Sequence, residues 1–212
     1  MRILVVGASG TVGAAAARAL SRHDIVRAGR SSGDVTVDLG SEESVRAMYA
    51  RLGKVDAVVA CAGHVHFGPV AAMTPEQFRK GLDDKLMGQI NLVLLGLAHV
   101  SDGGSFTLTS GVLDRDPVRA GANAAAVNGA IGGFVRGAAI EMPRGIRINA
   151  VSPGLLEESA QKYDGFFPGH ETVSSARVGL AYVKCVEGAL TGQVITAGGS
   201  RPPASYSFTG TV

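Results

Sequence analysis

The chain has 212 residues, of which 46% are hydrophobic, and a formal net charge of only +2. This length allows one well-buried core, and we expect a single domain over residues 1–212. Lys and Arg form no run, so the charge pattern favours a small-molecule partner over nucleic acid or an acidic membrane surface. Cys61 and Cys185 lie far apart in apolar surroundings, which predicts structural thiols and no metal site. With no targeting or membrane-spanning pattern in view, we expect a cytoplasmic protein.

Short β-branched runs alternate with longer helical patterns along the chain. In order, the pattern predicts strands at 3–6, 25–28, 35–37, 55–60, 105–109, 146–151 and 193–196, and helices at 11–22, 41–52, 75–100, 121–142 and 174–188. The looser polar stretch at 152–171 is expected to form a substrate or lid segment. This alternation predicts an α/β fold, a single Rossmann-type doubly wound parallel sheet with helices on both faces. In such a sheet a ligand lies at the carboxyl ends of the strands.

A glycine turn, Gly7-Ala8-Ser9-Gly10-Thr11-Val12-Gly13, follows the first predicted strand and ends where a helix begins. The first glycine allows a tight turn, the second leaves room for phosphate, and the third lets helix and strand approach closely. The free amides of the helix then face a pyrophosphate, with Ser9 and Thr11 as further donors. The alternative is a glycine-rich connection without a ligand. The strand before it and the helix after it favour a dinucleotide site.

The end of the second predicted strand indicates which dinucleotide would bind. Arg30 and Ser31 stand where an acidic residue would accept hydrogen bonds from the ribose of NAD. A guanidinium and a hydroxyl suit a 2′-phosphate instead, so we expect NADP(H). The alternative is a solvated loop arginine. Asp38 is expected near the exocyclic amine of adenine, with Leu39 supporting the ring.

Further landmarks resemble the short-chain dehydrogenase/reductase family over nearly the whole chain. Cys61-Ala62-Gly63 stands where that family has Asn-Ala-Gly, and the segment Arg147-Ile148-Asn149-Ala150-Val151-Ser152-Pro153-Gly154 is similar to its Arg-Val-Asn-x-Val-x-Pro-Gly. Glu141-Met142-Pro143-Arg144-Gly145 resembles the end of its catalytic helix. The resemblance implies that Cys61, Ala62 and Gly63 border the cofactor. It also implies that Pro153, Gly154 and Leu155 face the nicotinamide carboxamide.

The sequence departs from this family at the catalytic Tyr-x-x-x-Lys pair. Counting back from Glu141, the tyrosine position falls on Ala124 and the lysine position on Asn128, while Lys85 stands where the family has an asparagine. The exchange predicts that Lys85 and Asn128 meet beside the nicotinamide ribose from opposite helices. Ser110 stands near the family's serine, although strict spacing places Gly111 there, and a slip of one residue on a strand would reverse the direction of its side chain.

A proton donor must replace the missing phenol if the chain is an enzyme. Lys85 is one candidate, since a desolvated lysine can titrate near neutrality, but it can also serve only as a ribose ligand. His64 and His66 are further candidates, although no carboxylate partner is visible in the sequence, and Tyr163 is a candidate lid residue.

Two functions follow from these observations. The first is an NADP(H)-dependent oxidoreductase for a small carbonyl or alcohol, with Ser110, Lys85 and Asn128 organising the site. The alternative is a protein that binds NADP(H) with little or no turnover, as a redox sensor or an assembly subunit. A Rossmann methyltransferase is disfavoured by Arg30 and by the 147–154 segment. The apolar region at 89–100 predicts a homodimer or homotetramer, although core burial would explain the same pattern.

Overall fold

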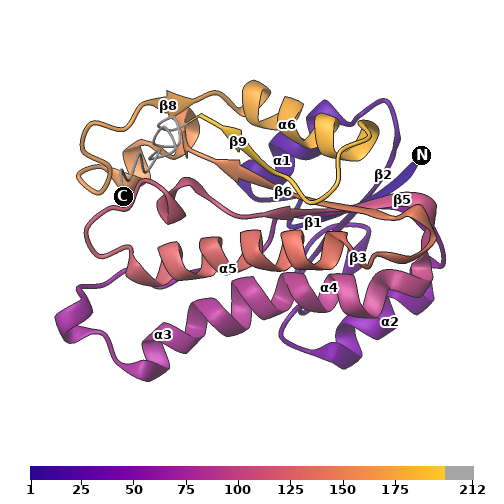
Figure 1. Cartoon of the computed structure of the whole chain (residues 1–212), viewed down its shortest axis with the longest axis horizontal. Helices are drawn as coiled ribbons and strands as arrows, with labels where there is room; N and C mark the ends of the chain where they lie inside the picture. Colours follow the sequence, from indigo (N-terminus) through magenta and orange to yellow (C-terminus); the bar gives the residue numbers. More distant parts are fainter. Residues whose placement is uncertain (199–212) are drawn as a thin grey trace, which may run out of the picture.

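The computed structural model describes residues 1–198, which form a seven-stranded sheet between two layers of helices (Figure 1). The strand order is β3-β2-β1-β4-β5-β6-β9, and all pairings are parallel. The strands are β1 (Arg2–Val6), β2 (Asp24–Gly29), β3 (Val35–Thr36), β4 (Val55–Ala60), β5 (Val100–Thr109), β6 (Arg147–Pro153) and β9 (Val194–Ala197). The chain builds outward in one direction from β1 to β3 and in the other from β4 to β9. This order confirms the predicted doubly wound fold and places a topological switch point between β1 and β4.

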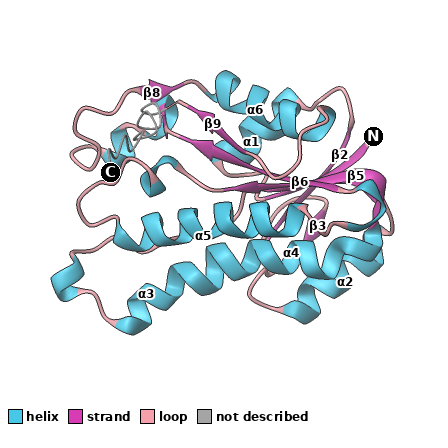
Figure 2. Cartoon of the chain, in the orientation of Figure 1, coloured by secondary structure: helices cyan, strands magenta, loops and turns pink. Residues whose placement is uncertain are grey.

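Helices cover both faces of the sheet (Figures 1 and 2). One layer holds α1 (Thr11–Ala19) and α6 (Ser175–Glu187), and the other holds α2 (Glu42–Leu52), α4 (Gly88–Gly96) and α5 (Ala122–Ala139). Alternating side chains of β1 build the two cores: Ile3 and Val5 pack with the α1–α6 layer, and Leu4 and Val6 with the opposite layer. All four are buried, as expected for a parallel strand covered on both faces.

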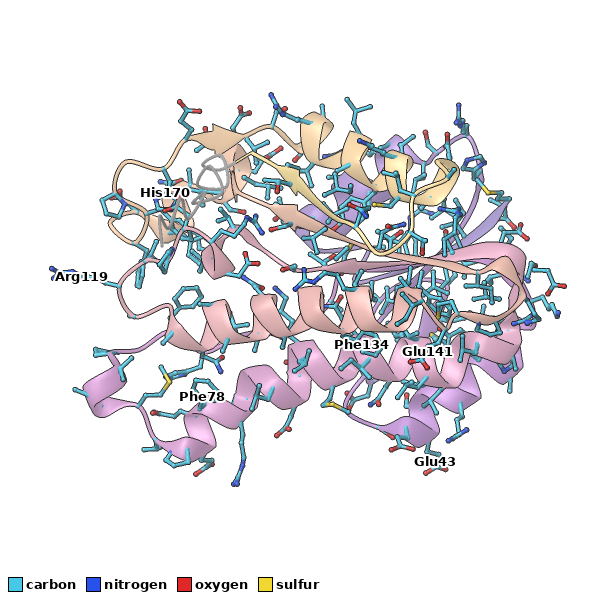
Figure 3. The ribbon with its side chains drawn as sticks, viewed as in Figure 1. Glu43, Phe78, Arg119, Phe134, Glu141 and His170 are labelled. Carbon is cyan, nitrogen blue, oxygen red and sulfur yellow. The ribbon has the colours of Figure 1, made fainter. Side chains whose placement is uncertain are left out.

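The loops that follow the strands gather at one end of the molecule. In Figure 3, His170, Arg119 and Phe78 are seen at this end, whereas Glu141, which follows α5, lies toward the opposite end. Helix α3 (Pro75–Gly81) projects beyond the sheet here. The predicted polar stretch contains β7 (Leu155–Leu156), which pairs in parallel with β8 (Thr172–Val173), and two 3₁₀ turns, η6 (Glu157–Ser159) and η7 (Gln161–Tyr163).

The region predicted as one helix at 75–100 is divided into four parts. Helix α3 continues into a π-helical turn, η2 (Leu82–Met87), then α4, then a 3₁₀ turn, η3 (Leu97–His99). Val100 already belongs to β5, where it pairs with Val55, so this strand begins five residues earlier than predicted. The prediction missed these breaks because a continuous apolar pattern does not distinguish an α-helical from a π-helical turn.

Two other predicted helices are too long. Helix α1 ends at Ala19 instead of residue 22, and α5 ends at Ala139 instead of residue 142. Pro143 accounts for part of the second difference, since a residue before proline is disfavoured in helical conformation and Met142 is extended, with ψ of 125°. None of the helices within residues 1–198 is long and apolar enough to cross a membrane.

Candidate active site

The glycine turn between β1 and α1 lies at the switch point of the sheet. Gly7 has a φ of +82°, and a Cβ there would lie 2.8 Å from the Ala62 amide nitrogen. A Cβ on Gly13 would overlap the Gly7 carbonyl, so only glycine permits helix and turn to pack this closely. Gly10 is the N-cap of α1 and makes no side-chain capping bond, which leaves the first amides of the helix available to a ligand. The turn therefore fits a pyrophosphate.

Two cavities lie side by side at this end of the sheet. The central cavity, of about 590 Å³, extends from the glycine turn to Ser110, Asn128 and the lid segment. The side cavity, of about 630 Å³, is lined by Arg30 and by residues of α3, η2 and α4. His64 and Val65 line both cavities, so these share a wall. An extended ligand such as a dinucleotide can span the two.

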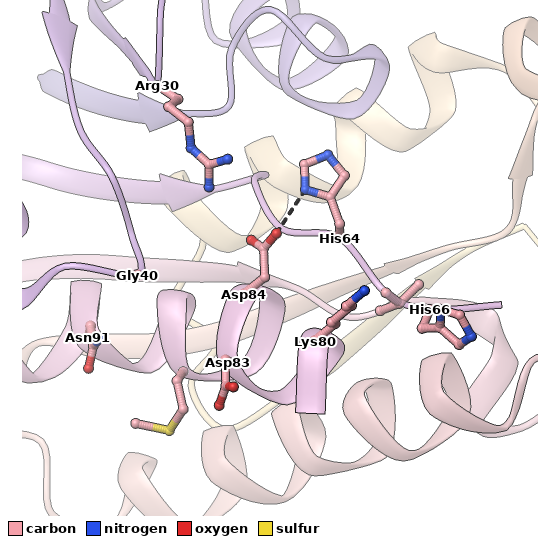
Figure 4. Close-up of a pocket in the computed structure, with 10 residues that line it drawn as sticks. Arg30, Gly40, His64, His66, Lys80, Asp83, Asp84 and Asn91 are labelled. Atoms are coloured by element: carbon pink, nitrogen blue, oxygen red, sulfur yellow. Dashed lines mark hydrogen bonds and ion pairs between the residues drawn. The ribbon is translucent and has the colours of Figure 1, made fainter. Parts of the chain in front are cut away.

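The side cavity contains Arg30, as a phosphate site would require (Figure 4). The guanidinium lies 3.5 Å from the Asp38 carboxylate, and both side chains are exposed. Asp38 also accepts a hydrogen bond from the Gly40 amide at 3.1 Å. Ser31 is exposed nearby, whereas Leu39 is buried in the core, with Asn91 of α4 donating to its carbonyl. Leu39 therefore packs in the core beneath the loop at Asp38 and does not line the side cavity.

His64 has a carboxylate partner that the sequence did not reveal. Its Nδ1 lies 3.0 Å from Oδ2 of Asp84, across the side cavity from Arg30 (Figure 4). The two residues are twenty positions apart, and η2 brings Asp84 to the loop after β4. The His66 amide donates to Asn123 Oδ1 at 2.8 Å. Neither imidazole contacts Lys85 or Ser110 through a hydrogen bond in the described part of the chain.

Lys85, Ser110 and Asn128 meet in the central cavity. The Lys85 ammonium donates to the Ser110 carbonyl and to Asn128 Oδ1, each at 2.9 Å. The Ser110 hydroxyl donates to the backbone carbonyl of Asn128 at 2.9 Å. Gly111 also lines this cavity, and a Cβ there would lie 2.8 Å from Asn128 Nδ2. Both candidate serine positions thus adjoin Asn128, and Ser110 carries the hydroxyl.

The position of Lys85 depends on the local backbone of two segments. The π-helical turn η2 gives the helix an irregular register where this lysine points toward α5. Gly63, with a φ of +125°, passes so close to the helix that a Cβ there would lie 2.6 Å from the Lys85 Cα. Two of the three ammonium N–H groups are used by Ser110 and Asn128. Within residues 1–198 the third has no protein acceptor and is left for a ligand in the cavity.

Burial changes the acidity of Lys85. Removal of the ammonium from water lowers the Lys85 pKa to about 8, and the nearby Asp114 carboxylate partly opposes this shift. The amine can therefore give up a proton close to neutral pH. The two cysteines behave differently, because burial raises the pKa of Cys61 to about 11 and of Cys185 to about 12. Both are free thiols, protonated at neutral pH, as expected of structural cysteines.

A buried polar network that the sequence analysis missed fixes the end of β5. Gln89 of α4 donates to the Thr109 carbonyl at 3.0 Å and accepts from the Thr109 amide at 2.8 Å. The Thr109 hydroxyl donates to the Ala60 carbonyl and lies 2.7 Å from the Tyr182 hydroxyl. The signal for this network was a glutamine near the start of a mostly apolar helix. It holds Ser110, the next residue, at a defined position.

An ion pair anchors the loop that follows β5. Arg115 contacts Asp114, at the end of the 3₁₀ turn η4 (Val112–Asp114), at 2.9 Å and donates to the Ser152 hydroxyl of β6 at 2.8 Å. Asn123 ties the start of α5 to α3, since its Nδ2 donates to the Phe78 carbonyl at 2.6 Å. The contacts of Arg115 with Ser152 and of Asn123 with Phe78 were also not predicted, because they join residues 37 and 45 positions apart in the chain.

Comparison with known proteins identifies the class to which this fold and cavity belong. A family model described as Enoyl-(Acyl carrier protein) reductase matches residues 3–181, and the chain belongs to the short-chain dehydrogenase/reductase family. This is a family of oxidoreductases that use nicotinamide cofactors.

Individual relatives agree with this assignment. The protein lin1944 from Listeria innocua is 50% identical, with a TM-score of 0.91 over 92% of this chain and 98% of that one. A small-chain dehydrogenase in complex with NADPH is 27% identical, with a TM-score of 0.81 over 92% of this chain and 95% of that one. "Glucose and ribitol dehydrogenase homolog 2" of Arabidopsis thaliana is 26% identical over 164 residues, which are 70% of this chain and 57% of the relative. The chain thus spans little more than half of that relative.

Proposed function

We propose that the chain is an NADP(H)-dependent oxidoreductase that interconverts a small carbonyl compound and its alcohol. The observation that carries this proposal is the Lys85 ammonium, held by Ser110 and Asn128 in the same cavity as the glycine turn. An enclosed cation that titrates near neutrality, beside a dinucleotide cradle, is typical of a reacting site.

The cofactor is proposed to extend across both cavities. The amides after Gly10 would hold the pyrophosphate, with Ser9 and Thr11 beside it, and Cys61, Ala62 and Gly63 would border the ribose. Arg30 and Ser31 would bind the 2′-phosphate of NADP(H), with Asp38 near adenine, and the similarity to an NADPH complex supports this preference. Pro153, Gly154 and Leu155, which line the central cavity, would face the carboxamide. NADPH, when bound, supplies the hydride.

We further propose that the family's Tyr-x-x-x-Lys pair is absent here and that Lys85 replaces the tyrosine as proton donor. Ala124 and Asn128 occupy the two positions, four residues apart on the cavity face of α5. The Lys85 ammonium has one N–H free to donate to a substrate oxygen, and its lowered pKa favours transfer of that proton. Asn128 and the Ser110 carbonyl orient the ammonium. A cation also stabilises the negative charge that develops on the carbonyl oxygen.

A non-catalytic NADP(H)-binding protein would use the same cradle, with Lys85 as a ribose ligand only. One measurement tests the cofactor preference, and a second separates the two functions. Fluorescence titration should show tighter binding of NADPH than of NADH, and equal affinities would remove the role given to Arg30. A panel of aldehydes and ketones should then support NADPH oxidation, whereas tight binding without oxidation of NADPH by any of them would contradict the catalytic proposal.

We also propose that the chain forms a homodimer or homotetramer through α4 and α5. The exposed residues on α5 are Arg136 and a stripe of small residues, Ala126, Gly129, Gly133 and Gly137, that ends near Ile140, which is 90% exposed. Leu94 of α4 is also 56% exposed. Small residues let two helices approach closely, and the exposed apolar side chains would be covered by a second copy. Light scattering on the purified protein tests this, and a monomeric mass would contradict it.

A further inference from the structure

One part of the lining of the central cavity, here called the apolar wall, consists of aliphatic and aromatic side chains. Val112, Leu113 and Ala124 form a small buried cluster, against which Phe67 and Phe167 pack. All five line the central cavity. This cluster is separate from the two main cores of the sheet. It therefore forms part of the cavity lining and not of the main cores.

Aromatic rings extend this wall into the lid segment. The ring centroid of Phe67 lies 6.2 Å from that of Tyr163 and 6.0 Å from that of Phe166. The rings of Tyr163 and Phe167 are 5.9 Å apart, and Phe167 packs edge-on against His170 at 5.2 Å. These spacings are typical of paired aromatic side chains. Phe67 comes from the loop after β4 and the others from the lid, so the rings join two segments distant in sequence.

Polar contacts fix the loop after β5, which carries part of the apolar wall, to β6 and to the lid. Arg115 joins η4 to β6 through Asp114 and the Ser152 hydroxyl, as described above. His170 lies 3.2 Å from the Asp116 carboxylate, which connects the lid to the same loop. The apolar wall is thus attached by polar contacts between residues that do not themselves line the cavity. It presents a shaped surface to a ligand.

Polar side chains line the central cavity in two main places, but not on its apolar wall. Lys85, Asn128 and Ser110 lie together, and Glu158, Ser159, Lys162 and Tyr163 line the cavity from the lid, whereas Val112, Leu113, Ala124, Phe67 and Phe167 offer no polar side-chain group. A sugar or polyol buried against this wall would lose hydrogen bonds to water for several hydroxyl groups and regain few of them. An apolar ring would gain contact area with the wall at no such cost. Charged Lys162 and Glu158 are exposed residues at the lid.

We propose that the substrate is an apolar, ring-bearing ketone or secondary alcohol with a single polar function. Its oxygen lies at Lys85, and its ring packs between Phe67, Leu113 and Tyr163. The small side chain of Ala124 leaves room for that ring. This inference rests on the proposed function, because it assigns a substrate class to the same site.

Two ketones test this proposal: α-tetralone, which is apolar and contains an aromatic ring, and D-xylulose, which is polar and carries several hydroxyl groups. NADPH oxidation with α-tetralone should have a kcat/KM about tenfold or more above that with D-xylulose. Phe67→Ala should raise the KM for α-tetralone about tenfold with little change in kcat or in NADPH affinity, and Phe67→Leu should restore most of the loss. Preference for D-xylulose, or an unchanged KM in Phe67→Ala, would overturn the proposal.

Calorimetry separates this inference from the proposed function. Binding of α-tetralone and D-xylulose is measured on the chain alone and on its NADP⁺ complex. If NADPH is not oxidised but α-tetralone still binds and D-xylulose does not, catalysis fails and the proposed ligand class stands. If NADPH binds and is oxidised by polar ketones while α-tetralone does not bind, the ligand class fails and the proposed function stands.

Discussion

Replacement of Lys85 by methionine tests the proposed proton donor. The substitution removes the ammonium but keeps an unbranched side chain of similar length to pack beside Gly63. General acid catalysis contributes about 10²–10⁴ in rate, so Lys85→Met should lower kcat for carbonyl reduction by at least about 100-fold. Lys54→Met is the matched control, because Lys54 is exposed in the turn between α2 and β4. It should retain wild-type activity.

The pH dependence of reduction follows from the same residue. A donor must be protonated, and the Lys85 pKa is lowered to about 8. The reduction rate should therefore be constant below pH 8 and fall about tenfold per pH unit above it. Steady-state rates at saturating NADPH measure this profile. A Lys85→Met rate within about threefold of wild type, or a wild-type rate that rises above pH 8, would refute the proposed role.

Stability should change in the opposite direction from activity. A lysine whose pKa is about 8 when folded and about 10.4 when unfolded costs about 3 kcal/mol of unfolding free energy while both states are protonated, below pH 8. The cost is relieved as pH rises from 8 to 10.4. Lys85→Met removes it but leaves the Ser110 carbonyl and Asn128 Oδ1 without this donor, a loss of about 1–3 kcal/mol. At pH 7 the variant should be as stable as wild type or more so by urea unfolding. A large loss of stability would instead indicate a structural lysine.

Three further substitutions test the other parts of the site. Arg30→Ala should weaken NADPH binding about 10- to 100-fold by fluorescence titration and leave NADH binding unchanged. Arg27→Ala, three residues earlier on β2, is the control and should change neither affinity. Equal losses for both cofactors would contradict a phosphate role for Arg30. Gly63→Ala should abolish most activity and lower the Tm, because the added Cβ would collide with Lys85 in η2. Gly103→Ala is the control, because Gly103 also has a positive φ, of +71°, but has open space around it. Equal effects of the two substitutions would exclude the collision as the cause. Tyr182→Phe should lower the unfolding free energy by about 1–2 kcal/mol, because it removes the contact with the Thr109 hydroxyl, and it should not alter the preference for NADPH. An unchanged urea midpoint would show that this contact does not contribute to stability.

Much of the fold could be predicted because its signals are local. The β-branched run before Gly7 and the glycine spacing after it specify a strand, a turn and a helix within twelve residues. The strand at Val55–Ala60 was predicted with its exact bounds, since the run between Lys54 and Cys61 is apolar except at Asp56. Repetition of this unit then implies the parallel sheet.

The site was only partly predictable, because its contacts join distant elements. The resemblance to a known family indicated that Lys85 and Asn128 would meet, and the structure places their side chains 2.9 Å apart. It did not indicate the π-helical turn that holds Lys85, which depends on packing against the loop at Gly63. The partner of His64 and the aromatic wall around Phe67 were missed for the same reason. Aromatic contacts between Phe67 and the distant lid segment leave no pattern in the sequence.

Transfer of deuterium from labelled cofactor to substrate tests the central claim most directly. The protein is incubated with a ketone and with NADPH that carries two deuterium atoms on the ring carbon that donates hydride, and the products are analysed by mass spectrometry. If the chain is an NADP(H)-dependent oxidoreductase, the alcohol carries one deuterium on its carbinol carbon, and Lys85→Met forms far less of it. Saturable NADPH binding with no deuterium in any product, for apolar and polar ketones alike, would contradict the claim.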